Sequence, residues 1–260
     1  MSTKVFMHGL NGKMGQTISR LVEKSDTIEF SGGAGSKELY DSSKNVLAKD
    51  NTNFTKLLNS SDVIVDFTND IGNKSLFDFI KSQNINSKKL VIASTGLSEA
   101  SLDGWRKLCE SNDLSLLLAP NTSLGVLLTM QLSRTMAKVL SPLGFDIEIT
   151  EAHHKFKKDS PSGTATFLAD SICKDVDLKP VFERSSERKD NELGVFAIRG
   201  GSVFGEHTVH FMGQEEYLKL SHQALSRDLF GKGALLLAKW INGKSSGFYE
   251  LEQVELDELV

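Results

Sequence analysis

The N-terminal half of the chain alternates short apolar runs with stretches of helical periodicity. The apolar runs have the length of buried strands and lie at residues 5–7, 28–32, 63–67, 90–93 and 114–118. Between them apolar residues recur every three or four positions, as Trp105 and Leu108 do in a helix that Ser98 would cap. This repeated order of strand, helix and strand predicts a parallel sheet with helices on both faces.

The pattern changes after Asn121. A long amphipathic helix is predicted over residues 124–140, and apolar and polar positions then alternate over 145–150, as in a half-buried strand. Further strands without long helices between them are expected at residues 195–198, 203–212 and 217–221. The polar segment 175–191 is interpreted as a surface excursion, and a last helix is expected over 230–241. The second half therefore predicts an open mixed or antiparallel sheet with an apolar face.

The composition is that of a folded protein, since 39% of the 260 residues are hydrophobic and 25% are charged. A net charge of −4 argues against a general nucleic-acid binder. Two cysteines, Cys109 and Cys173, are too few for a disulfide framework or a metal knuckle, so we expect free thiols in a reducing compartment. The N-terminus lacks the apolar region of a signal peptide, and every apolar run is too short to span a bilayer. We expect a cytoplasmic protein with neither nucleic-acid nor membrane partners.

A glycine-rich loop follows the first predicted strand and opens the first predicted helix. Its glycines, Gly9, Gly12 and Gly15, have the spacing G-x-x-G-x-x-G in place of the common G-x-G-x-x-G. Glycines at this place let the backbone approach a pyrophosphate, whose charge the helix N-terminus attracts. We favour dinucleotide binding, with a tight strand–helix turn as the alternative.

The end of the second predicted strand bears on the choice of cofactor. An acidic residue there would bond the ribose 2′-hydroxyl of NAD, but the likely contact positions hold Ser36 and Lys37, which suit a 2′-phosphate. Lys13 would add a second positive charge, while Glu38 lies one or two residues late for the acidic role. An ordinary solvated lysine remains the alternative for Lys37.

Three more polar loops follow predicted strands at the sheet edge where nucleotides bind. They are Phe67-Thr68-Asn69, Ser94-Thr95-Gly96 and the segment Ala119-Pro120-Asn121-Thr122. Polar residues after buried strands are also common turn chemistry, so each loop is a weak signal by itself.

The segment EAHHKFKKDSPSGTAT, residues 151–166, combines titratable, cationic and helix-opening residues. His153 and His154 would point to opposite sides of an extended strand, so they are poorly placed to share a metal. Lys157 would bind one carboxylate, and the backbone of Ser162-Gly163-Thr164 at a helix start would bind another. The segment is typical of a site that binds and protonates an anionic substrate. The alternative is a charged loop that leads into a capped helix.

Together these residues resemble the family of 4-hydroxy-tetrahydrodipicolinate reductase, also called dihydrodipicolinate reductase, of the diaminopimelate route to lysine. The segment EAHHKFKKDSPSGTA is similar to the family signature E-(L/A)-H-H-x-x-K-x-D-(A/S)-P-S-G-T-A over its whole length. The loop HGLNGKMG resembles the family's nucleotide loop. Further similar segments are VDFT at 65–68, STG at 94–96, NTSLG at 121–125 and RGGSVFGEHTVHF at 199–211. The resemblance runs from about residue 4 to Trp240.

The resemblance implies an α/β fold with two domains. A Rossmann-like dinucleotide domain with a parallel sheet would comprise residues 1–123 and 228–260. Residues 124–227 would form an α+β substrate domain whose open mixed sheet assembles a homotetramer. By position, His153 is the general acid, and His154, Lys157, Ser162, Gly163 and Thr164 bind a dicarboxylate, with Arg227 as a further substrate or hinge residue. Gly9, Gly12, Lys13 and Met14 would hold the cofactor, with Thr95, Gly96 and residues 119–122 near its nicotinamide ring.

The implied reaction is the reduction of a cyclic imine that carries two carboxylates and loses water. NADPH or NADH would give a hydride and His153 or Lys157 a proton, without a metal. Many members carry Arg at the positions of Lys13 and Lys37 and an acidic residue at that of Ser36, which leaves the preferred cofactor open. His8 is unusual before the first glycine and has no role that the sequence assigns.

Two other functions fit parts of the sequence. An amino-acid dehydrogenase acting on aspartate or diaminopimelate would share the dinucleotide half, but would need an ammonia-handling site in place of the histidine–lysine and PSGT segments. An NADP-binding protein that senses redox state would have no need of the intact segment 151–164. Oxidation of NADPH with and without the pathway intermediate distinguishes these alternatives.

Overall fold

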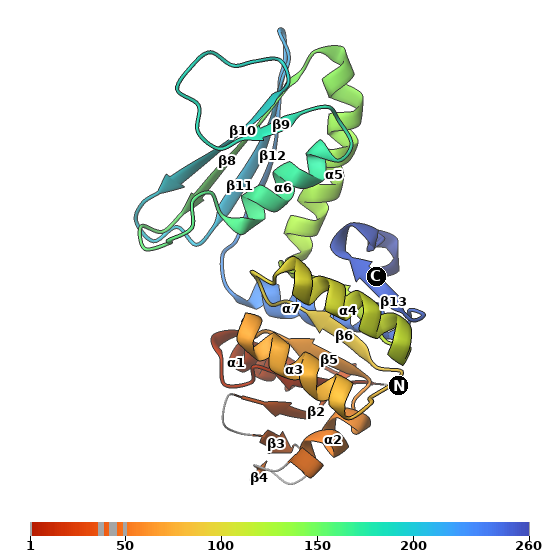
Figure 1. Ribbon diagram of the computed structural model, residues 1–260. Coiled ribbons are helices and arrows are strands. Elements are labelled where there is room, and N and C mark those ends of the chain that lie inside the picture. Colours follow the sequence, from red (N-terminus) through yellow and green to blue (C-terminus); the bar gives the residue numbers. More distant parts are fainter. Residues whose placement is uncertain (1, 36–38, 42–45, 49–50, 260) are drawn as a thin grey trace. The chain divides into compact units, whose positions relative to one another are not determined.

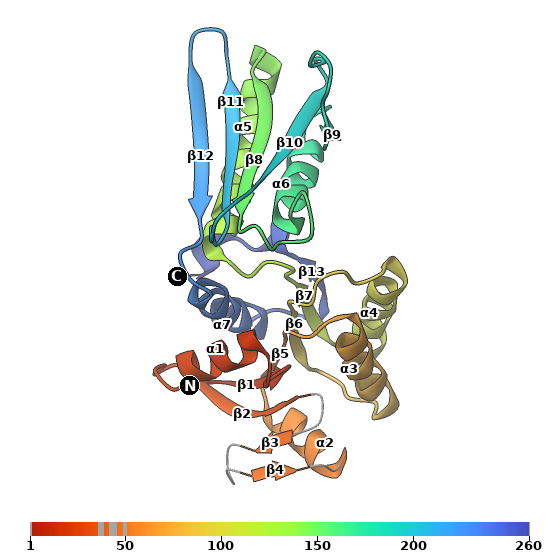
Figure 2. The same ribbon diagram turned by 90° about the vertical axis from the view of Figure 1, so that its left-hand side faces the viewer.

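The structure is a computed structural model that describes residues 2–35, 39–41, 46–48 and 51–259. The chain divides into two compact units, the first comprising Met1–Ser123 with Arg227–Val260 and the second Leu124–Ser226. Arg227 belongs to the first unit, one residue outside the predicted extent of that domain. Figures 1 and 2 show the two units from perpendicular directions.

The first unit contains an eight-stranded sheet in the order β13-β7-β6-β5-β1-β2-β3-β4. Its strands are β1 (Thr3–His8), β2 (Ile28–Ala34), β3 (Leu39–Asp41), β4 (Val46–Ala48), β5 (Val63–Asp66), β6 (Lys89–Ile92), β7 (Ser115–Leu118) and β13 (Gly247–Glu250). The six strands from β13 to β2 are parallel, which confirms the predicted Rossmann-like sheet. Three strands of this sheet were not predicted: β13 at one edge, and β3 and β4, which add an antiparallel hairpin at the other edge beside β2.

Helices cover both faces of this sheet, as the repeated strand–helix order predicted. They are α1 (Lys13–Val22), α2 (Asn51–Ser60), α3 (Asp70–Ser82), α4 (Glu99–Asn112) and α7 (Asp228–Asn242), followed by the 3₁₀ turns η2 (Leu251–Gln253) and η3 (Leu256–Leu259). Figure 2 shows α1 and α7 on one face and α3 and α4 on the other. Alternate strand residues such as Phe6, Ile64 and Leu90 are fully buried on the face that α3 and α4 cover, where they form a core with Trp105 of α4. Ser98 caps α4 as predicted, because its side chain accepts from the Ser101 amide.

The second unit contains a five-stranded mixed sheet in the order β12-β11-β8-β10-β9. Its elements are α5 (Leu124–Leu140), η1 (Ser141–Leu143), β8 (Asp146–His153), α6 (Gly163–Cys173), β9 (Lys179–Val181), β10 (Glu192–Arg199), β11 (Glu206–Met212) and β12 (Tyr217–Gln223). β8 is parallel to β10 and antiparallel to β11, so the predicted mixed sheet is confirmed. The helix predicted over residues 124–140 is also confirmed.

Residue alternation along β8 decides which side chains reach the site. Ile147 and Ile149 are fully buried on the face that α5 and α6 cover. Glu151 and His153 have the same parity, so they continue this face at the carboxyl end of the strand. This end adjoins the N-terminus of α6, where the Ser162 amide contacts the Glu151 carboxylate.

Two expectations about the second unit were wrong. The segment 175–191 is more than a surface excursion, because it contributes β9, and Arg184 and Arg188 bind the carboxylate of Glu148. The other face of the sheet is not simply apolar. Ile198 is 60% exposed, but the same face also carries hydrogen-bonded polar pairs, Thr150 with His210 and Thr208 with Ser221.

Candidate functional site

The glycine loop at the end of β1 is built for close backbone approach. Gly9 has a φ of +91°, and a Cβ there would lie 2.9 Å from the carbonyl oxygen of Phe67. A Cβ at Gly15 would lie 2.2 Å from the Leu10 carbonyl oxygen, so the third glycine lets α1 pack against its own loop. Gly12 is the N-cap of α1 and has no side chain to occupy the first amides of the helix. The loop thus presents an open helix N-terminus, which favours an anionic group.

A cavity of about 740 Å³ lies beside this loop at the carboxyl edge of the parallel strands. Four of the predicted cofactor residues line it: Gly9, Gly12, Phe67 and Thr68. Lys13 and Met14 open α1 without lining the cavity. Asn69, of the predicted loop Phe67-Thr68-Asn69, also lines it, and the remaining lining residues are His8, Asn11, Gly35, Ile71, Gly72 and Ser75. The volume lies within the range of small-molecule and cofactor pockets.

Beneath the cavity, the fully buried carboxylate of Asp66 accepts five hydrogen bonds. The donors are His8 Nδ1 at 2.8 Å, the Thr68 amide and hydroxyl at 3.1 and 2.7 Å, Asn73 Nδ2 at 2.9 Å and the Ser94 hydroxyl at 2.6 Å. Burial alone would raise the pKa of Asp66, but His8, Asn73 and Ser94 outweigh it and hold that pKa below its ordinary value. His8 therefore has a structural partner that only the parallel register of β1 and β5 reveals.

Ser94, Thr95, Gly96 and residues 119–122 do not line this cavity. Ser94 is buried against Asp66, whereas Thr95 and Gly96 are exposed after β6, Gly96 with a φ of +74°. Within the segment 119–122, Ala119 is buried, Pro120 is exposed, and Asn121 accepts from the Ser123 amide. The Thr122 hydroxyl donates to the Phe230 carbonyl at 2.7 Å, which ties the segment to α7. Ser36 and Lys37 lie outside the described residues.

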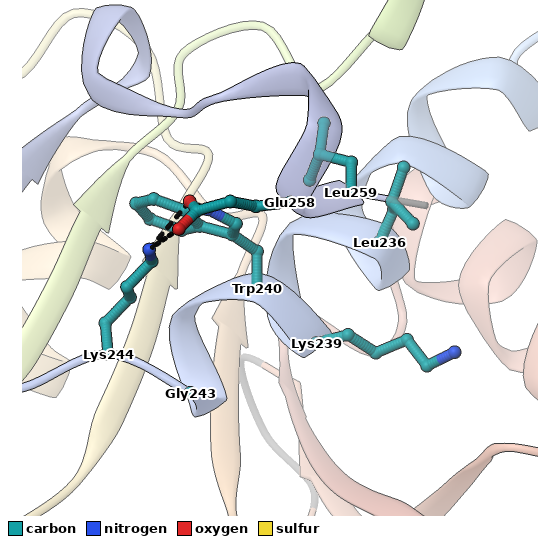
Figure 3. A pocket seen from close by; sticks show the side chains of 7 residues that line it. All are labelled: Leu236, Lys239, Trp240, Gly243, Lys244, Glu258 and Leu259. Carbon is teal, nitrogen blue, oxygen red and sulfur yellow. Dashed lines mark hydrogen bonds and ion pairs between the residues drawn. The ribbon is translucent and has the colours of Figure 1, made fainter.

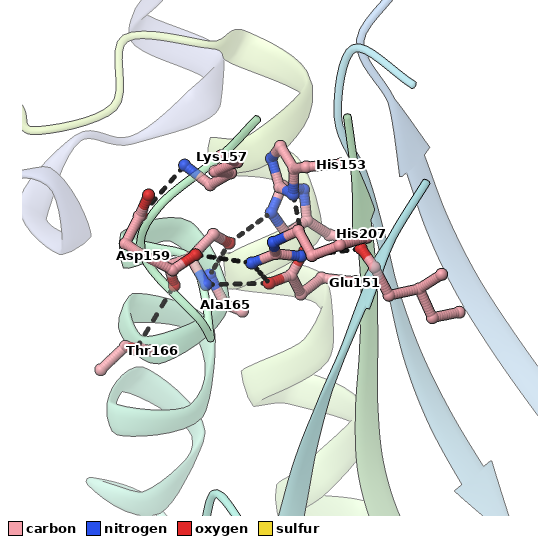
Figure 4. A network of polar contacts seen from close by, with 10 residues as sticks. Glu151, His153, Lys157, Asp159, Ala165, Thr166 and His207 are labelled. Atoms are coloured by element: carbon pink, nitrogen blue, oxygen red, sulfur yellow. Dashed lines mark hydrogen bonds and ion pairs between the residues drawn. The ribbon is translucent and has the colours of Figure 1, made fainter. Parts of the chain in front are cut away.

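In the second unit, the centre of the site is a carboxylate that the sequence did not single out. Glu151, 1% exposed, lies 2.6 Å from His153 Nδ1 and accepts from the Ser162 amide at 2.9 Å. Arg199 approaches both carboxylate oxygens, with Nη1 2.8 Å from Oε2 and Nη2 2.7 Å from Oε1. Figure 4 shows Glu151 and His153 of β8 next to His207 of β11, with Ala165 of α6 nearby. Burial would raise the pKa of Glu151, but Arg199, His153 and the Ser162 amide together hold it below the ordinary value.

Two buried histidines lie edge to face here, with His153 and His207 ring centroids 5.2 Å apart. Burial lowers the pKa of His153, and the charges of Lys157 and Arg199 add to this, against the opposing effect of Glu151. Burial lowers the pKa of His207 further, to about 3, so that ring is neutral. Its Nε2 lies 3.1 Å from the Ser162 hydroxyl, which also caps α6 by accepting from the Ala165 amide.

The predicted anion-binding residues gather around Asp159. Lys157 Nζ lies 2.9 Å from the Asp159 carboxylate, and the Gly163 amide also contacts it. Gly163 is exposed, and a Cβ there would meet open space, so the N-terminus of α6 is accessible. Thr164 follows in the first turn, and His154 is half-buried after the end of β8 with its ring 6.4 Å from that of Phe156. The structure therefore brings His153, Lys157 and the first turn of α6 together within one unit.

Arg227 belongs to the other compact unit. It is exposed at the N-cap position of α7 in the first unit, without a side-chain bond that caps the helix. Its role in substrate binding therefore stays a prediction.

Three further findings concern the cysteines, possible metal sites and possible membrane spans. Both described cysteines are free, and burial raises the pKa of Cys109 to about 12 and that of Cys173 to about 11, so neither thiol is a nucleophile near neutral pH. Across the described residues, His, Cys, Asp and Glu side chains form no group of three that could hold a metal ion. Within the same ranges, no helix combines the length and apolar character needed to cross a bilayer.

A second cavity, of about 410 Å³, lies between the end of α7 and the C-terminal turn (Figure 3). Glu258 lines it and accepts from Trp240 Nε1 at 2.6 Å and from Lys244 Nζ at 2.6 and 2.7 Å. These polar groups satisfy one another, so we regard the contact as a structural tie of the C-terminal tail to α7.

Both halves of the chain match models of one family. The model described as dihydrodipicolinate reductase, N-terminus, matches residues 3–122, and the one described as dihydrodipicolinate reductase, C-terminus, matches residues 125–254. The chain belongs to the dihydrodipicolinate reductase family. The 4-hydroxy-tetrahydrodipicolinate reductase of Aquifex aeolicus is 38% identical over 98% of this chain and 99% of its own length.

Solved structures agree with the family fold. The dipicolinate-bound dihydrodipicolinate reductase of Paenisporosarcina sp. TG-14 has a TM-score of 0.78 at 23% identity, covering 98% of this chain and 100% of that one. A diaminopimelate dehydrogenase of C. glutamicum, solved with diaminopimelate, has a TM-score of 0.59 at 11% identity, covering 100% and 96%. At these identities the likeness concerns the fold, which the reductase family thus shares with an amino-acid dehydrogenase.

Family membership also indicates how the missed site residues could have been found. Arg199 and His207 both belong to the segment RGGSVFGEHTVHF, which resembles the family although the sequence assigned it no role. Glu151 opens the family signature itself. Because β10 and β11 flank β8, these two segments come together at the site.

Proposed function

We propose that this protein catalyses the NAD(P)H-dependent reduction of 4-hydroxy-tetrahydrodipicolinate to tetrahydrodipicolinate with loss of water, in the diaminopimelate pathway of lysine biosynthesis. The observation that carries the proposal is the grouping of His153, Lys157 and the open start of α6. It occurs in a chain that both family models match. A buried imidazole beside two cationic features suits protonation of a dianion.

The first unit is the proposed cofactor domain. A bound NADPH or NADH supplies the hydride. The fit to such a group is good, because Gly9 and Gly15 leave no room for a Cβ while the first amides of α1 lack a capping side chain. Gly12 and the loop of Phe67 and Thr68 would hold the dinucleotide beside the cavity of about 740 Å³. Lys13, Met14, Ser36, Lys37, Ser94, Thr95, Gly96 and residues 119–122 complete the proposed set.

The second unit is the proposed substrate domain. Lys157 and the amides of Gly163 and Thr164 would bind one substrate carboxylate in place of Asp159, whose own carboxylate now contacts Lys157. His154 and Ser162 are proposed as neighbouring contacts, and Arg227 as a further one. His153 would donate the proton that completes the reduction.

We place this chemistry in the cytoplasm, as a homotetramer built through the open sheet of the second unit. Support for assembly is the exposed Ile198 on the outer face of that sheet and Tyr217 at its edge, 60% and 49% exposed. A closed homotetramer would cover such exposed side chains by repeating one interface between copies of the chain.

The decisive experiment follows NADPH and NADH absorbance at 340 nm with freshly prepared 4-hydroxy-tetrahydrodipicolinate. Substrate-dependent oxidation of either cofactor is expected, with competition by dipicolinate. The matched assay is reduction of NADP⁺ with diaminopimelate or aspartate. Activity only in the second assay would replace the proposal with an amino-acid dehydrogenase. Cofactor binding without turnover in either assay would leave a redox-sensing protein.

A further inference from the structure

His153 has two ring nitrogens in contrasting surroundings. Nδ1 faces the Glu151 carboxylate at 2.6 Å, whereas no described residue hydrogen-bonds Nε2. A Cβ at Gly205 would lie 3.1 Å from Nε2, so the absent side chain leaves space beside this nitrogen. One nitrogen is thus anchored, and the other is available to a ligand.

The anchoring carboxylate can only accept hydrogen bonds. The two bonds from Arg199 and the one from the Ser162 amide all favour the ionised form of Glu151, and its pKa lies below the ordinary value despite burial. A carboxylate has no proton to give, so the proton between Glu151 and His153 belongs to Nδ1. Neutral His153 must therefore leave Nε2 without a proton.

We infer that Glu151, clamped by Arg199, is a positioning residue that keeps a proton on Nδ1 of His153 and directs Nε2 to the substrate. The inference rests on the proposed function, because it assigns Nε2 the proton donated in that reaction. The imidazolium would lose its Nε2 proton to the ring that accepts the hydride. His153 would then return to the neutral Nδ1–H form, which Glu151 already binds.

The charges around the ring make Glu151 necessary. Lys157 of the loop after β8 and Arg199 of β10 oppose protonation of His153, and neutral His207 of β11 packs against the edge of the ring. Burial lowers the pKa of His153 in the same direction, and Glu151 is the group that opposes it. Without this carboxylate, the imidazolium would form only at lower pH.

The test is Glu151→Gln, which keeps the shape and removes the charge. We expect kcat to fall about 10- to 1,000-fold, which is part of a general acid's usual contribution of about 10²–10⁴. The limb of the kcat profile that descends with rising pH should move to lower pH by about one unit or more. Glu151→Asp retains the charge, so the descending limb of its kcat profile should lie between those of the wild type and Glu151→Gln.

Glu148→Gln is the matched control. Glu148 is also a buried glutamate of β8 clamped by an arginine, since Arg184 contacts its two oxygens at 2.9 and 3.2 Å, but it lies on the other face. This variant should share any loss of stability and keep the wild-type pH profile. If Glu151→Gln also keeps that profile and turns over at the wild-type rate, Glu151 has no positioning role.

A spectroscopic measurement decides the point without a variant of Glu151. In wild-type protein with ¹⁵N-labelled histidine, the His153 signals, assigned by their loss in His153→Gln, should report the Nδ1–H tautomer at neutral pH. A neutral Nε2–H tautomer would overturn the inference. Failure of the proposed function would give a different result. The wild-type protein would then not oxidise NAD(P)H with the substrate, whichever tautomer of His153 is found.

Discussion

At the scale of single residues, His153 and Lys157 differ in their surroundings and therefore in their expected roles. The ring of His153 is buried and held by Glu151, whereas Lys157 is partly exposed and contacts Asp159. A fixed imidazole suits proton transfer, and a lysine whose present partner is a surface carboxylate suits exchange for a substrate carboxylate.

His153→Gln should lower kcat by about 10²–10⁴-fold with a modest change in KM, because a general acid is lost. Lys157→Ala should also raise KM, because a charge-assisted contact to substrate disappears. Inhibition by dipicolinate should weaken more in Lys157→Ala than in His153→Gln. Fluorescence titration with NADPH provides the control, since both residues belong to the second unit. Near-normal turnover in both variants would contradict the roles proposed for them.

We expect the cofactor preference to depend on Ser36 and Lys37, which follow β2 in the sequence. Ser36 with Lys37 should let NADPH bind at least as well as NADH, since neither repels a 2′-phosphate. Lys37→Glu should shift the preference towards NADH, with Lys81→Glu on α3 as a control for net charge. Calorimetric titration of both cofactors measures this. Much tighter binding of NADH by the unaltered protein would contradict it.

His207 should make stability depend on pH. The pKa of His207 is about 3 in the folded protein, below the ordinary value of about 6.5. Between pH 3 and about 6.5, this side chain is therefore protonated in the unfolded chain and neutral in the folded one. The free energy of unfolding should fall as pH drops below about 6.5, by up to about 1.4 kcal/mol per unit from this group. Urea titrations at a series of pH values give the free energy of unfolding as a function of pH. Between pH 6.5 and 4 this free energy should change less steeply with pH in His207→Gln than in the wild type. Above pH 7.5 the pH dependence of the two proteins should be the same. Equal slopes below pH 6.5 would show that His207 contributes nothing.

At the scale of elements, Asp66 joins the end of β5 to its neighbours. It binds His8 of β1, Asn73 of α3 and Ser94 after β6, and Asn73 in turn accepts from Trp105 Nε1 of α4 at 2.9 Å. One buried carboxylate thus connects two adjoining strands and two helices below the proposed cofactor cavity.

Asp66→Ala should lower the free energy of unfolding by about 1–3 kcal/mol or more, because several buried donors lose their acceptor. Asp78→Ala is the control, since Asp78 forms an exposed pair with Lys74 on α3, and such pairs contribute about 0–1 kcal/mol. Chemical denaturation monitored by tryptophan fluorescence compares the two. Similar losses in both variants would show that the Asp66 contacts are not stabilising.

At the scale of the whole molecule, the two units meet different physical demands. The first unit buries its parallel sheet on both faces, while the second covers one face of its sheet with α5 and α6. Among the described residues no helix covers the other face, which suits an interface between copies of the chain, although Arg184 and Arg188 cover Glu148 there and hydrogen-bonded polar pairs occupy another part.

We expect a tetramer in light scattering at micromolar concentration. Ile198→Asp should weaken the assembly, because it places a charge at a side chain that is 60% exposed on the outer face. Ile71→Asp, at a 79% exposed position of the first unit, controls for added surface charge. A monomer in the unaltered protein would refute the assembly.

The sequence by itself determined the local elements and the chemical type of the site. Periodicity identified α5 and five of the six parallel strands, all except β13, since each of these depends on nearby residues. The glycine loop and the signature of residues 151–164 indicated a nucleotide and an anion, because backbone access and charge are properties of local composition.

Only the tertiary structure decided which distant groups pair. The strands β3 and β9 are three residues long and carry too little pattern to be recognised without their neighbours. Arg199 meets Glu151 across 48 residues, and His8 meets Asp66 across 58. Strand order and register bring these partners together, and local periodicity predicts neither the order nor the register of the strands. The ionisation of Glu151 and the orientation of His153 were therefore decided by the sheet that carries them.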